Sequence, residues 1–488
     1  MKNIFTYGLL CFSCVIVSSC STLKRAPKQT HEDLLQKEIW RNELPHADTT
    51  PVKPHFPKVL EKTLSNGLRV FVVEDKRLPI VEIGVAFKNG SALDPIGKAG
   101  LQNLTTTMLK EGTTKLTSLE LAEAFANLGT EVRMGVGKDL AYISAGVLSN
   151  KVKDAFALIS SMVQNPRLSE DDFARVKLQQ QNSIQSDLGT PNYVAQVRFL
   201  MAAYGEKHPY AYPSAGTVQT LGNINLNDVK KSHKLNFGPN NAALVVAGDV
   251  TLKQVTNLAE RYFGHWKKIK DPFRPVPSPK KSKQMQTILV SRPSMPQTLL
   301  LVGQPAATQK DKNLPTYEVF QNILAGMPTS RLGANLRERK GWTYGVHSSL
   351  TPLRGLGPLL VSTSVQVPYG ADALKEILAE FENMKKNPVT SEELNSAKSG
   401  LMNSFASRYS TLKKIASSTW ENFIYDLPKD FDEKFYNQIA RVTPQDIMDT
   451  AKSALAKDRM IAVGVGDLEV MEIPLAKMSV GQVIIDRD

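Results

Sequence analysis

The chain of 488 residues is too long for one ordinary domain, and its 42% hydrophobic and 22% charged residues are typical of globular proteins with sizeable cores. Its net charge of +13 could indicate a polyanionic partner, but +6 of this excess lies in one segment, HWKKIKDPFRPVPSPKKSK at 265–283. The four prolines of this segment indicate a solvated linker, and no zinc-finger spacing, phosphate-binding loop or aromatic RNA-binding signature accompanies it. We therefore expect no nucleic-acid partner.

The N-terminus, MKNIFTYGLLCFSCVIVSSC, holds all three cysteines, and its one Lys is followed by roughly sixteen mostly apolar residues. This run is too short for a transmembrane helix of about 20 residues, and it fits the core of a signal peptide. VSSC at 17–20 resembles a bacterial lipobox, in which cleavage falls before a cysteine that is then lipidated. An ordinary signal peptide with a chance cysteine is the alternative.

The lipobox resemblance implies a signal peptide at 1–19 and a lipid anchor on Cys20. Ser21 stands where Asp would favour retention in the inner membrane, so the expected location is the outer membrane, facing the periplasm. Several acyl chains would anchor the protein stably to the membrane. A cleaved chain would keep only one cysteine, which excludes disulfides from the fold. Residues 20–57 are predicted to form a tether that becomes Pro-rich toward its end.

Strand and helix patterns follow along the first half of the chain. TLSNGLRVFVVED at 63–75 predicts a strand, an Asn66-Gly67 turn and a strand, and IVEIGVAF at 80–87 predicts a further strand. Helices are predicted in the stretch 100–113, which carries three consecutive threonines, and in SLELAEAFANLG, which ends at Gly129. A second hairpin is predicted over 130–148, and further helices follow to about residue 205.

Two pairs of similar motifs at nearly equal separations indicate an internal repeat. Asn-Pro followed by a capping-box helix start occurs at Asn165 and again at Asn387, 222 residues later. Gly-Asp after an apolar run occurs at Gly248 and Gly466, which are 218 residues apart. The predicted fold class is α+β, with two homologous domains that are each a mostly antiparallel sheet with helices packed on one face. The predicted domains cover 58–264 and 285–475, with the basic linker at 265–284 and a tail at 476–488.

Several motifs in both halves resemble the pitrilysin/insulinase family of zinc peptidases. The similarity is to its short two-domain members, such as the subunits of the mitochondrial processing peptidase, and it extends over roughly residues 58 to 475. It rests on five motifs, which are LSNGLRVFVVED (64–75), MLKEGT (108–113), HPYAYPSAGT (208–217), LVVAGDV (244–250) and SRLGANLRERKGWTYGV (330–346).

In active members of this family, the helix before an M-L-x-x-G-T element carries H-x-x-E-H, in which two His bind zinc and the Glu activates a bound water. The resemblance places Asn103 and Thr107 at the histidine positions, Thr106 at the base position and Ser183 near the third ligand, a glutamate. Neutral amides and hydroxyls are poor zinc ligands, and the seven histidines include no pair at i and i+4. We therefore expect no metal, no cofactor and no catalytic residue in this chain. An ordinary polar helix turn, never derived from a metal site, is the alternative.

Arg337 and Tyr344 lie seven residues apart in NLRERKGWTYGV. In the family, an Arg and a Tyr at this spacing reach the peptide held at the zinc site, so the resemblance implies a substrate-binding pair. Without the family, Arg337 would be read as a solvated helix residue and Tyr344 as half-buried packing.

Degenerate metal positions together with a retained Arg/Tyr pair imply a non-catalytic, substrate-binding subunit of a heterodimeric zinc metalloendopeptidase that acts on peptides in the bacterial envelope. Zinc would belong to a homologous partner subunit. The alternative is a proteolytically inert scaffold or peptide-binding lipoprotein of the outer membrane, and an active peptidase formed by this chain alone is the least favoured hypothesis. The sequence leaves open the substrate, the identity of the partner and whether the dimer contains one or two kinds of chain.

Overall fold

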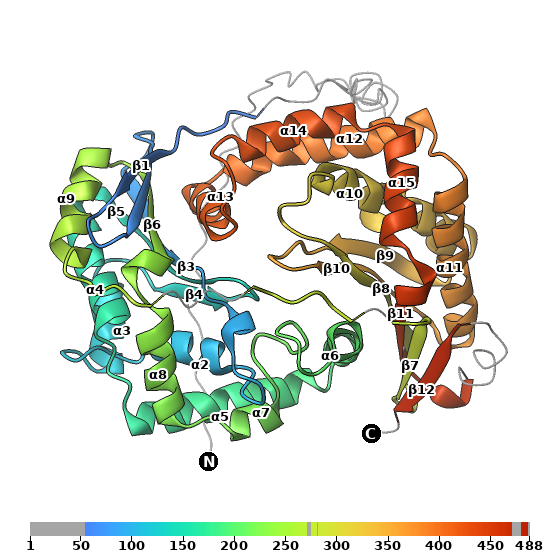
Figure 1. Ribbon diagram of the computed structural model, residues 1–488, viewed down its shortest axis with the longest axis horizontal. Coiled ribbons are helices and arrows are strands. Elements are labelled where there is room, and N and C mark those ends of the chain that lie inside the picture. Colours follow the sequence, from blue (N-terminus) through green and yellow to red (C-terminus); the bar gives the residue numbers. More distant parts are fainter. Residues whose placement is uncertain (1–53, 271–274, 281, 471–479, 487–488) are drawn as a thin grey trace, which may run out of the picture. The chain divides into compact units, whose positions relative to one another are not determined.

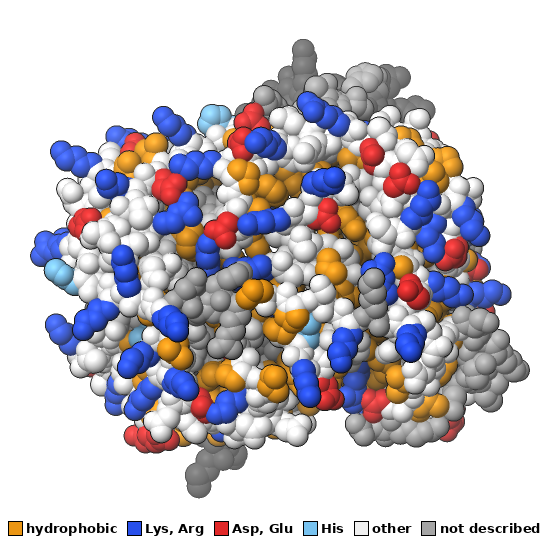
Figure 2. All heavy atoms as spheres, viewed as in Figure 1, with side chains coloured by type: hydrophobic (Ala, Val, Ile, Leu, Met, Phe, Trp, Pro, Cys, Tyr) orange, Lys and Arg blue, Asp and Glu red, His pale blue; other side chains and the backbone are white. Residues whose placement is uncertain are grey.

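The computed structural model describes residues 54–270, 275–280, 282–470 and 480–486, all of which belong to one compact unit, Thr50–Asp488. The predicted signal peptide, Cys20 and most of the predicted tether lie outside the described residues. Among the helices that the structure describes, none is long and apolar enough to cross a membrane. Lys and Arg side chains are spread over the face shown in Figure 2, interspersed with Asp and Glu, rather than gathered into one patch.

The first half of the chain forms a six-stranded sheet (Figure 1). Its strands, in spatial order, are β1 (Leu60–Thr63), β2 (Arg69–Glu74), β6 (Ala242–Gly248), β3 (Ile80–Phe87), β5 (Ala141–Leu148) and β4 (Arg133–Val136). Only β2 and β6 pair in parallel. Both predicted hairpins are confirmed, since β1 pairs with β2 and β4 pairs with β5, and Gly67 adopts the positive φ of 88° that the first turn requires.

The second half forms a second six-stranded sheet. Its strands, in spatial order, are β12 (Gln482–Asp486), β7 (Gln286–Ser291), β11 (Ile461–Gly466), β8 (Gln297–Ala307), β10 (Gly357–Gln366) and β9 (Thr343–Leu350). The last five of these pair in the same order and directions as β2, β6, β3, β5 and β4 of the first sheet. Gly248 and Gly466 end the equivalent strands β6 and β11, so the internal repeat is confirmed.

Helices pack on one face of each sheet, as the fold class predicts. The first half contains the helices α2 (Leu101–Met108), α3 (Ser118–Ala126), α4 (Val152–Gln164), α5 (Glu170–Asp187), α7 (Val218–Gly222), α8 (Leu226–Asn236) and α9 (Leu252–Phe263), and also α6 (Pro191–Tyr204), which packs on the other sheet. The second half contains α10 (Leu314–Gln321), two π-helical segments, η5 (Asn322–Gly326) and η6 (Gly333–Arg339), α11 (Gly370–Lys386), α12 (Ser391–Phe405), α14 (Phe431–Arg441) and α15 (Pro444–Ala454), and also α13 (Leu412–Ile424), which packs on the first sheet.

The repeated helix starts use side-chain caps. The Ser169 hydroxyl accepts a hydrogen bond from the Asp172 N–H at the start of α5. At the equivalent α12, Thr390 and Glu393 form a complete capping box. Each cap satisfies backbone N–H groups that have no partner inside the helix. The helix starts predicted after the two Asn-Pro motifs are thus confirmed.

The opposite face of each sheet is covered by a helix from the other half of the chain. Helix α13 packs on β3 and β6 of the first sheet, and α6 packs on β8 and β11 of the second (Figure 1). Strand β3 is therefore buried along nearly its whole length, on both faces. The exchange is reciprocal, so the two halves share their hydrophobic cores.

Trp420 is the central contact of α13 with the first sheet. Its side chain is only 4% exposed, and its ring stacks on that of Tyr142 with 5.0 Å between centroids. The ring also occupies the space beside Gly84, where an added Cβ would lie 2.8 Å from Trp420 Cζ3. Only glycine at this position of β3 leaves room for the indole.

We predict that Trp420→Ala lowers the free energy of unfolding by about 3–5 kcal/mol, because it opens a large cavity between α13 and the first sheet. Urea denaturation measures this loss, and both halves should unfold in one transition since each completes the core of the other. Lys413→Ala, an exposed position on the same helix, is the matched control and should change stability by about 0.5 kcal/mol or less. A loss of similar size in the control would contradict the role given to Trp420.

Candidate functional site

Helix α2, which carries three of the positions predicted to be degenerate metal ligands, is packed tightly in the first half. Leu101, Leu104 and Met108 are buried in a cluster with residues of α5 and α8. Gly100 precedes the helix with a φ of 96°, and an added Cβ there would lie 2.4 Å from the Ala215 carbonyl oxygen. The helix therefore keeps its position without a metal ion.

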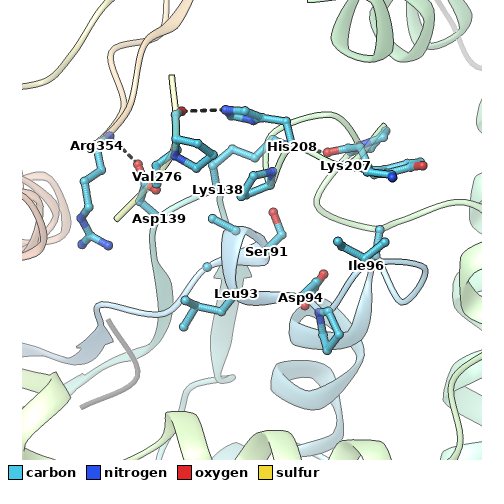
Figure 3. Close-up of a pocket in the computed structure, with 18 of the residues that line it drawn as sticks. Ser91, Leu93, Asp94, Ile96, Lys138, Asp139, Lys207, His208, Val276 and Arg354 are labelled. Atoms are coloured by element: carbon cyan, nitrogen blue, oxygen red, sulfur yellow. Dashed lines mark hydrogen bonds between the residues drawn. The ribbon is translucent and has the colours of Figure 1, made fainter. Parts of the chain in front are cut away.

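The start of α2 is capped by a carboxylate from outside the helix. Asp94 accepts hydrogen bonds from the backbone N–H groups of Gly100 and Gln102, both at 2.8 Å. Figure 3 shows Asp94 on the wall of a cavity of about 270 Å³ that Lys138, His208 and Arg354 also line. Burial raises the pKa of Asp94 to about 7 and lowers the pKa of Lys138 to about 8, and each charge partly offsets the shift of the other.

Three other polar groups of this cavity form hydrogen bonds that stabilise the neighbouring backbone. The Lys138 ammonium donates to the Tyr212 carbonyl oxygen. Asp139 accepts a hydrogen bond from the Arg354 backbone N–H at 2.7 Å (Figure 3). His208 lies in a turn in which its Nδ1 accepts from the Tyr210 N–H and its Nε2 lies 2.9 Å from the Pro277 carbonyl oxygen. His208 therefore belongs to a structural turn.

The three threonines of α2 differ in their surroundings. Thr105 and Thr106 are buried, and their hydroxyls donate to the carbonyl oxygens of Leu101 and Gln102 at 2.8 Å. This bond to the preceding turn satisfies a buried hydroxyl and makes threonine acceptable inside a helix. Asn103 and Thr107 are half-buried and lie one turn apart on the same face. Thr106, at the base position, has no group that could take a proton from water near neutral pH.

Ser183 is exposed on α5, the helix that packs against α2. The structure thus brings together the two helices that the aligned metal site requires, but every side chain at the aligned positions is a neutral amide or hydroxyl. Across 54–270, 275–280, 282–470 and 480–486, no group of three or more His, Cys, Asp or Glu side chains could hold a metal ion. The described residues therefore do not fit the zinc of the related peptidases.

Tyr344 lies on a β-bulge at the start of β9. Tyr344 and Gly345 together face Ser364 of β10, since Val365 pairs with Thr343 and Thr363 pairs with Val346. The Thr343 hydroxyl lies 2.9 Å from the Gly345 carbonyl oxygen and 2.8 Å from that of Ser364, which fixes the bulge. A bulge redirects the side chain that it carries, and Tyr344 is 91% exposed. The alternative reading of this tyrosine as half-buried packing is therefore wrong.

Arg337 lies on η6, which packs against β9. Its side chain is 49% exposed and forms an ion pair with its neighbour Glu338 at 3.3 Å. Segments η5 and η6 are both π-helical, a rare conformation that occurs frequently at functional sites. Across the part of the chain that the structure describes, neither Arg337 nor Tyr344 forms a hydrogen bond or ion pair with α2, and the pair lies on η6 and β9, apart from the aligned metal positions.

Two family models match most of the region that the structure describes. "Insulinase (Peptidase family M16)" matches residues 69–217, and "Peptidase M16 inactive domain" matches residues 223–401. Together they cover more than half of the chain. The chain belongs to the insulinase family of peptidases.

Individual insulinase relatives extend over both halves. "Zinc protease PqqE" of Helicobacter pylori is 25% identical over 74% of this chain and 82% of its own length. "Non-peptidase homolog YmxG" of the same organism is 24% identical over 79% of this chain and 88% of its own length. The solved "peptidase M16 inactive domain" of Pseudomonas fluorescens has a TM-score of 0.78 at 26% identity and covers 84% of this chain and 98% of that chain. The protein is thus peptidase-like, with the two-sheet fold of the insulinase family.

We expect the purified protein to contain far less than one zinc ion per chain, because its aligned positions offer only neutral oxygen and nitrogen donors. Elemental analysis after dialysis against zinc measures this directly. A variant with Asn103→His, Thr106→Glu, Thr107→His and Ser183→Glu is the positive control, and it should gain zinc since α2 and α5 already pack together. One tightly held zinc in the unchanged protein, lost on Asn103→Ala, would contradict the degenerate reading.

Proposed function

We propose that this chain is the non-catalytic, substrate-binding subunit of a two-chain zinc metalloendopeptidase that acts on peptides in the bacterial envelope. The observation that carries the proposal is the exposure of Tyr344. A β-bulge directs this side chain outward, so that it is 91% exposed, while α2 of the same chain carries no zinc ligand. An exposed ring contributes little to the fold, and its hydroxyl is free to contact a peptide.

The two names from Helicobacter pylori support a division of labour within one organism. One relative is called a zinc protease and the other a non-peptidase homolog, and both align with most of this chain. A homologous partner subunit would supply zinc and the hydrolytic chemistry. This chain would supply Arg337 and Tyr344, which are on adjoining elements and reach solvent.

The two side chains suit different tasks on a bound peptide. The Arg337 guanidinium offers several N–H donors in a rigid plane, which can hold a substrate carbonyl group in a fixed orientation. The Tyr344 hydroxyl can donate to a carbonyl oxygen as negative charge develops on it. The Thr343 and Thr363 hydroxyls hold the backbone of the bulge, so the direction in which the Tyr344 side chain leaves the strand is set before the peptide arrives.

We predict that Tyr344→Phe lowers kcat of the assembled pair by about 100-fold to 1000-fold, because it removes one donor and keeps the ring. Arg337→Lys keeps the charge but loses the planar donors, so it should also slow turnover. The assay uses this chain together with the zinc-containing partner that co-purifies with it, and follows cleavage of a quenched fluorescent peptide. Melting temperature and co-elution should remain at the values of the unchanged pair.

His347→Ala is the matched control, since this residue is exposed on the same strand β9 and has no role in the proposal. It should leave turnover unchanged. If Tyr344→Phe and Arg337→Ala pairs assemble and cleave at normal rates, the substrate-binding role is wrong and the inert scaffold becomes the better explanation.

The proposed location in the outer membrane depends on Cys20, which lies outside the described residues. We predict an acyl mass on the N-terminal cysteine of the mature protein, detectable by mass spectrometry of its first tryptic peptide. Cys20→Ser should leave the chain uncleaved or misplaced, since cleavage and anchoring both require the thiol. A mature protein found free in the periplasm with an unmodified N-terminus would overturn this location.

A further inference from the structure

A cavity of about 610 Å³ lies between elements of the two halves, away from Arg337 and Tyr344. It is lined by the β4–β5 turn and α6 of the first half and by α10, α13, α14 and the β9–β10 connection of the second. Its volume falls within the range of about 300–1,000 Å³ that is typical of small-molecule sites. We call it the shared cavity, since both halves form its walls.

Two glutamates face the shared cavity from different helices. Glu421 on α13 and Glu318 on α10 both line it. Burial raises the pKa of each carboxyl above its ordinary value, and the Arg408 guanidinium partly opposes both shifts. Yet 44% of the Glu421 side chain remains accessible. Its accessible surface therefore borders the shared cavity that it lines.

Arg408 alone does not balance the acids around it. Its guanidinium lies 3.9 Å from Glu421 and 3.8 Å from Asp432, which are long distances for ion pairs. Asp432 is satisfied separately, because it accepts hydrogen bonds from Ser418 at 2.8 Å and from Asn422 at 3.4 Å. Glu318 accepts one hydrogen bond, from Gln321 at 2.6 Å. Across the described residues, the Glu421 carboxylate accepts no hydrogen bond, and its ion pair with Arg408 is long, so most of its acceptor capacity remains available.

Two further charged groups of the shared cavity are adjacent in the chain. Lys138 and Asp139 follow one another in the β4–β5 turn, and the Asp139 charge opposes the fall in the pKa of Lys138. Asp139 is also hydrogen-bonded by the Tyr210 hydroxyl at 2.8 Å. These two opposite charges offset one another. The net excess in the shared cavity is therefore negative and is located at Glu318 and Glu421.

Aromatic rings form much of the remaining wall. The rings that line the shared cavity are those of Phe199, Tyr204, Tyr210, Tyr425, Phe431 and Phe435. Aromatic faces attract cations through their quadrupole and also bury apolar surface. Two carboxylates with few polar partners lie beside this aromatic wall. They suit a positive charge attached to an apolar group, whereas an anion would be repelled by carboxylates whose charge is only partly balanced.

We propose that the shared cavity binds an organic cation, in which a protonated amine or amidine is joined to an apolar body. The positive group pairs with Glu421 and Glu318, and the apolar body lies among the rings. Either a free amine or the basic side chain of a peptide has this chemistry. The site is independent of the proposed proteolytic role, because none of its groups belongs to the Arg337/Tyr344 pair.

The test is calorimetric titration of the full purified chain, without a partner, using phenethylamine, benzamidine, cadaverine and spermidine. Phenethyl alcohol and phenylacetate are the neutral and anionic counterparts of the first probe. At least one amine or amidine should bind saturably, and the counterparts should bind at least about tenfold more weakly, as expected for the loss of a charge-assisted contact. A short peptide with one Lys, compared with its Nε-acetylated form, distinguishes a peptide source from a free amine.

Glu421→Gln and Glu318→Gln should each weaken binding by about tenfold or more while the melting temperature stays near that of the unchanged chain, because neither carboxylate anchors the fold. Glu433→Gln, an exposed position on α14 outside the shared cavity, is the matched control and should have no effect. The proposal is overturned if no cation binds saturably, if phenylacetate binds as well as phenethylamine, or if both cavity variants bind like the unchanged chain. None of these results depends on proteolysis.

Discussion

The constraint on which the rest of the structure depends is the burial of the second face of each sheet. A sheet with apolar residues on both faces must be covered twice, and in this chain the second cover comes from the other half. Trp420 on α13 lies over Gly84 of the first sheet, and Phe199 on α6 is buried with Val463 and Val465 of the second. The exchange also determines where the shared cavity lies, because α6 and α13 both form part of its wall.

Packing within the first half explains how α2 keeps its position without metal ligands. Its buried side consists of Leu101, Leu104 and Met108, and its start is held by Asp94 and by the close approach of Gly100 to Ala215. Asn103 and Thr107, at the aligned ligand positions, are on the half-buried side, where a change of side chain costs little stability. The packing of this helix thus does not depend on the side chains at these two positions.

Local signals in the sequence predicted much of the fold, because the features they predict are determined by short segments. The Asn66-Gly67 turn and the helix starts after Asn165 and Asn387 depend on residues within one or two turns of the chain. Gly248 is similar, since its φ of 134° and the approach of the Ile80 carbonyl oxygen leave no room for a Cβ. The repeat could also be recognised, because both copies carry Gly-Asp at the end of equivalent strands.

Features that depend on distant segments could not be predicted. The sequence IVEIGVAF indicates a strand, but it does not show that Glu82 is buried and paired with Arg133, or that a helix more than 300 residues later covers the strand. The bulge at Tyr344 depends on the register with β10, and no residue pattern in NLRERKGWTYGV reveals it. The shared cavity is even harder to predict from the sequence, since its acids come from α10 and α13, which are about a hundred residues apart.

The connection between the halves gives the helix exchange a further property. Two separate halves could bind each other through the same contacts, but their association would then depend on concentration and would be lost on dilution. In one chain, each half meets the other at an effective concentration set by the length of the connection. The pairing of α6 and α13 with the opposite sheets is therefore insensitive to how many copies of the protein a cell contains.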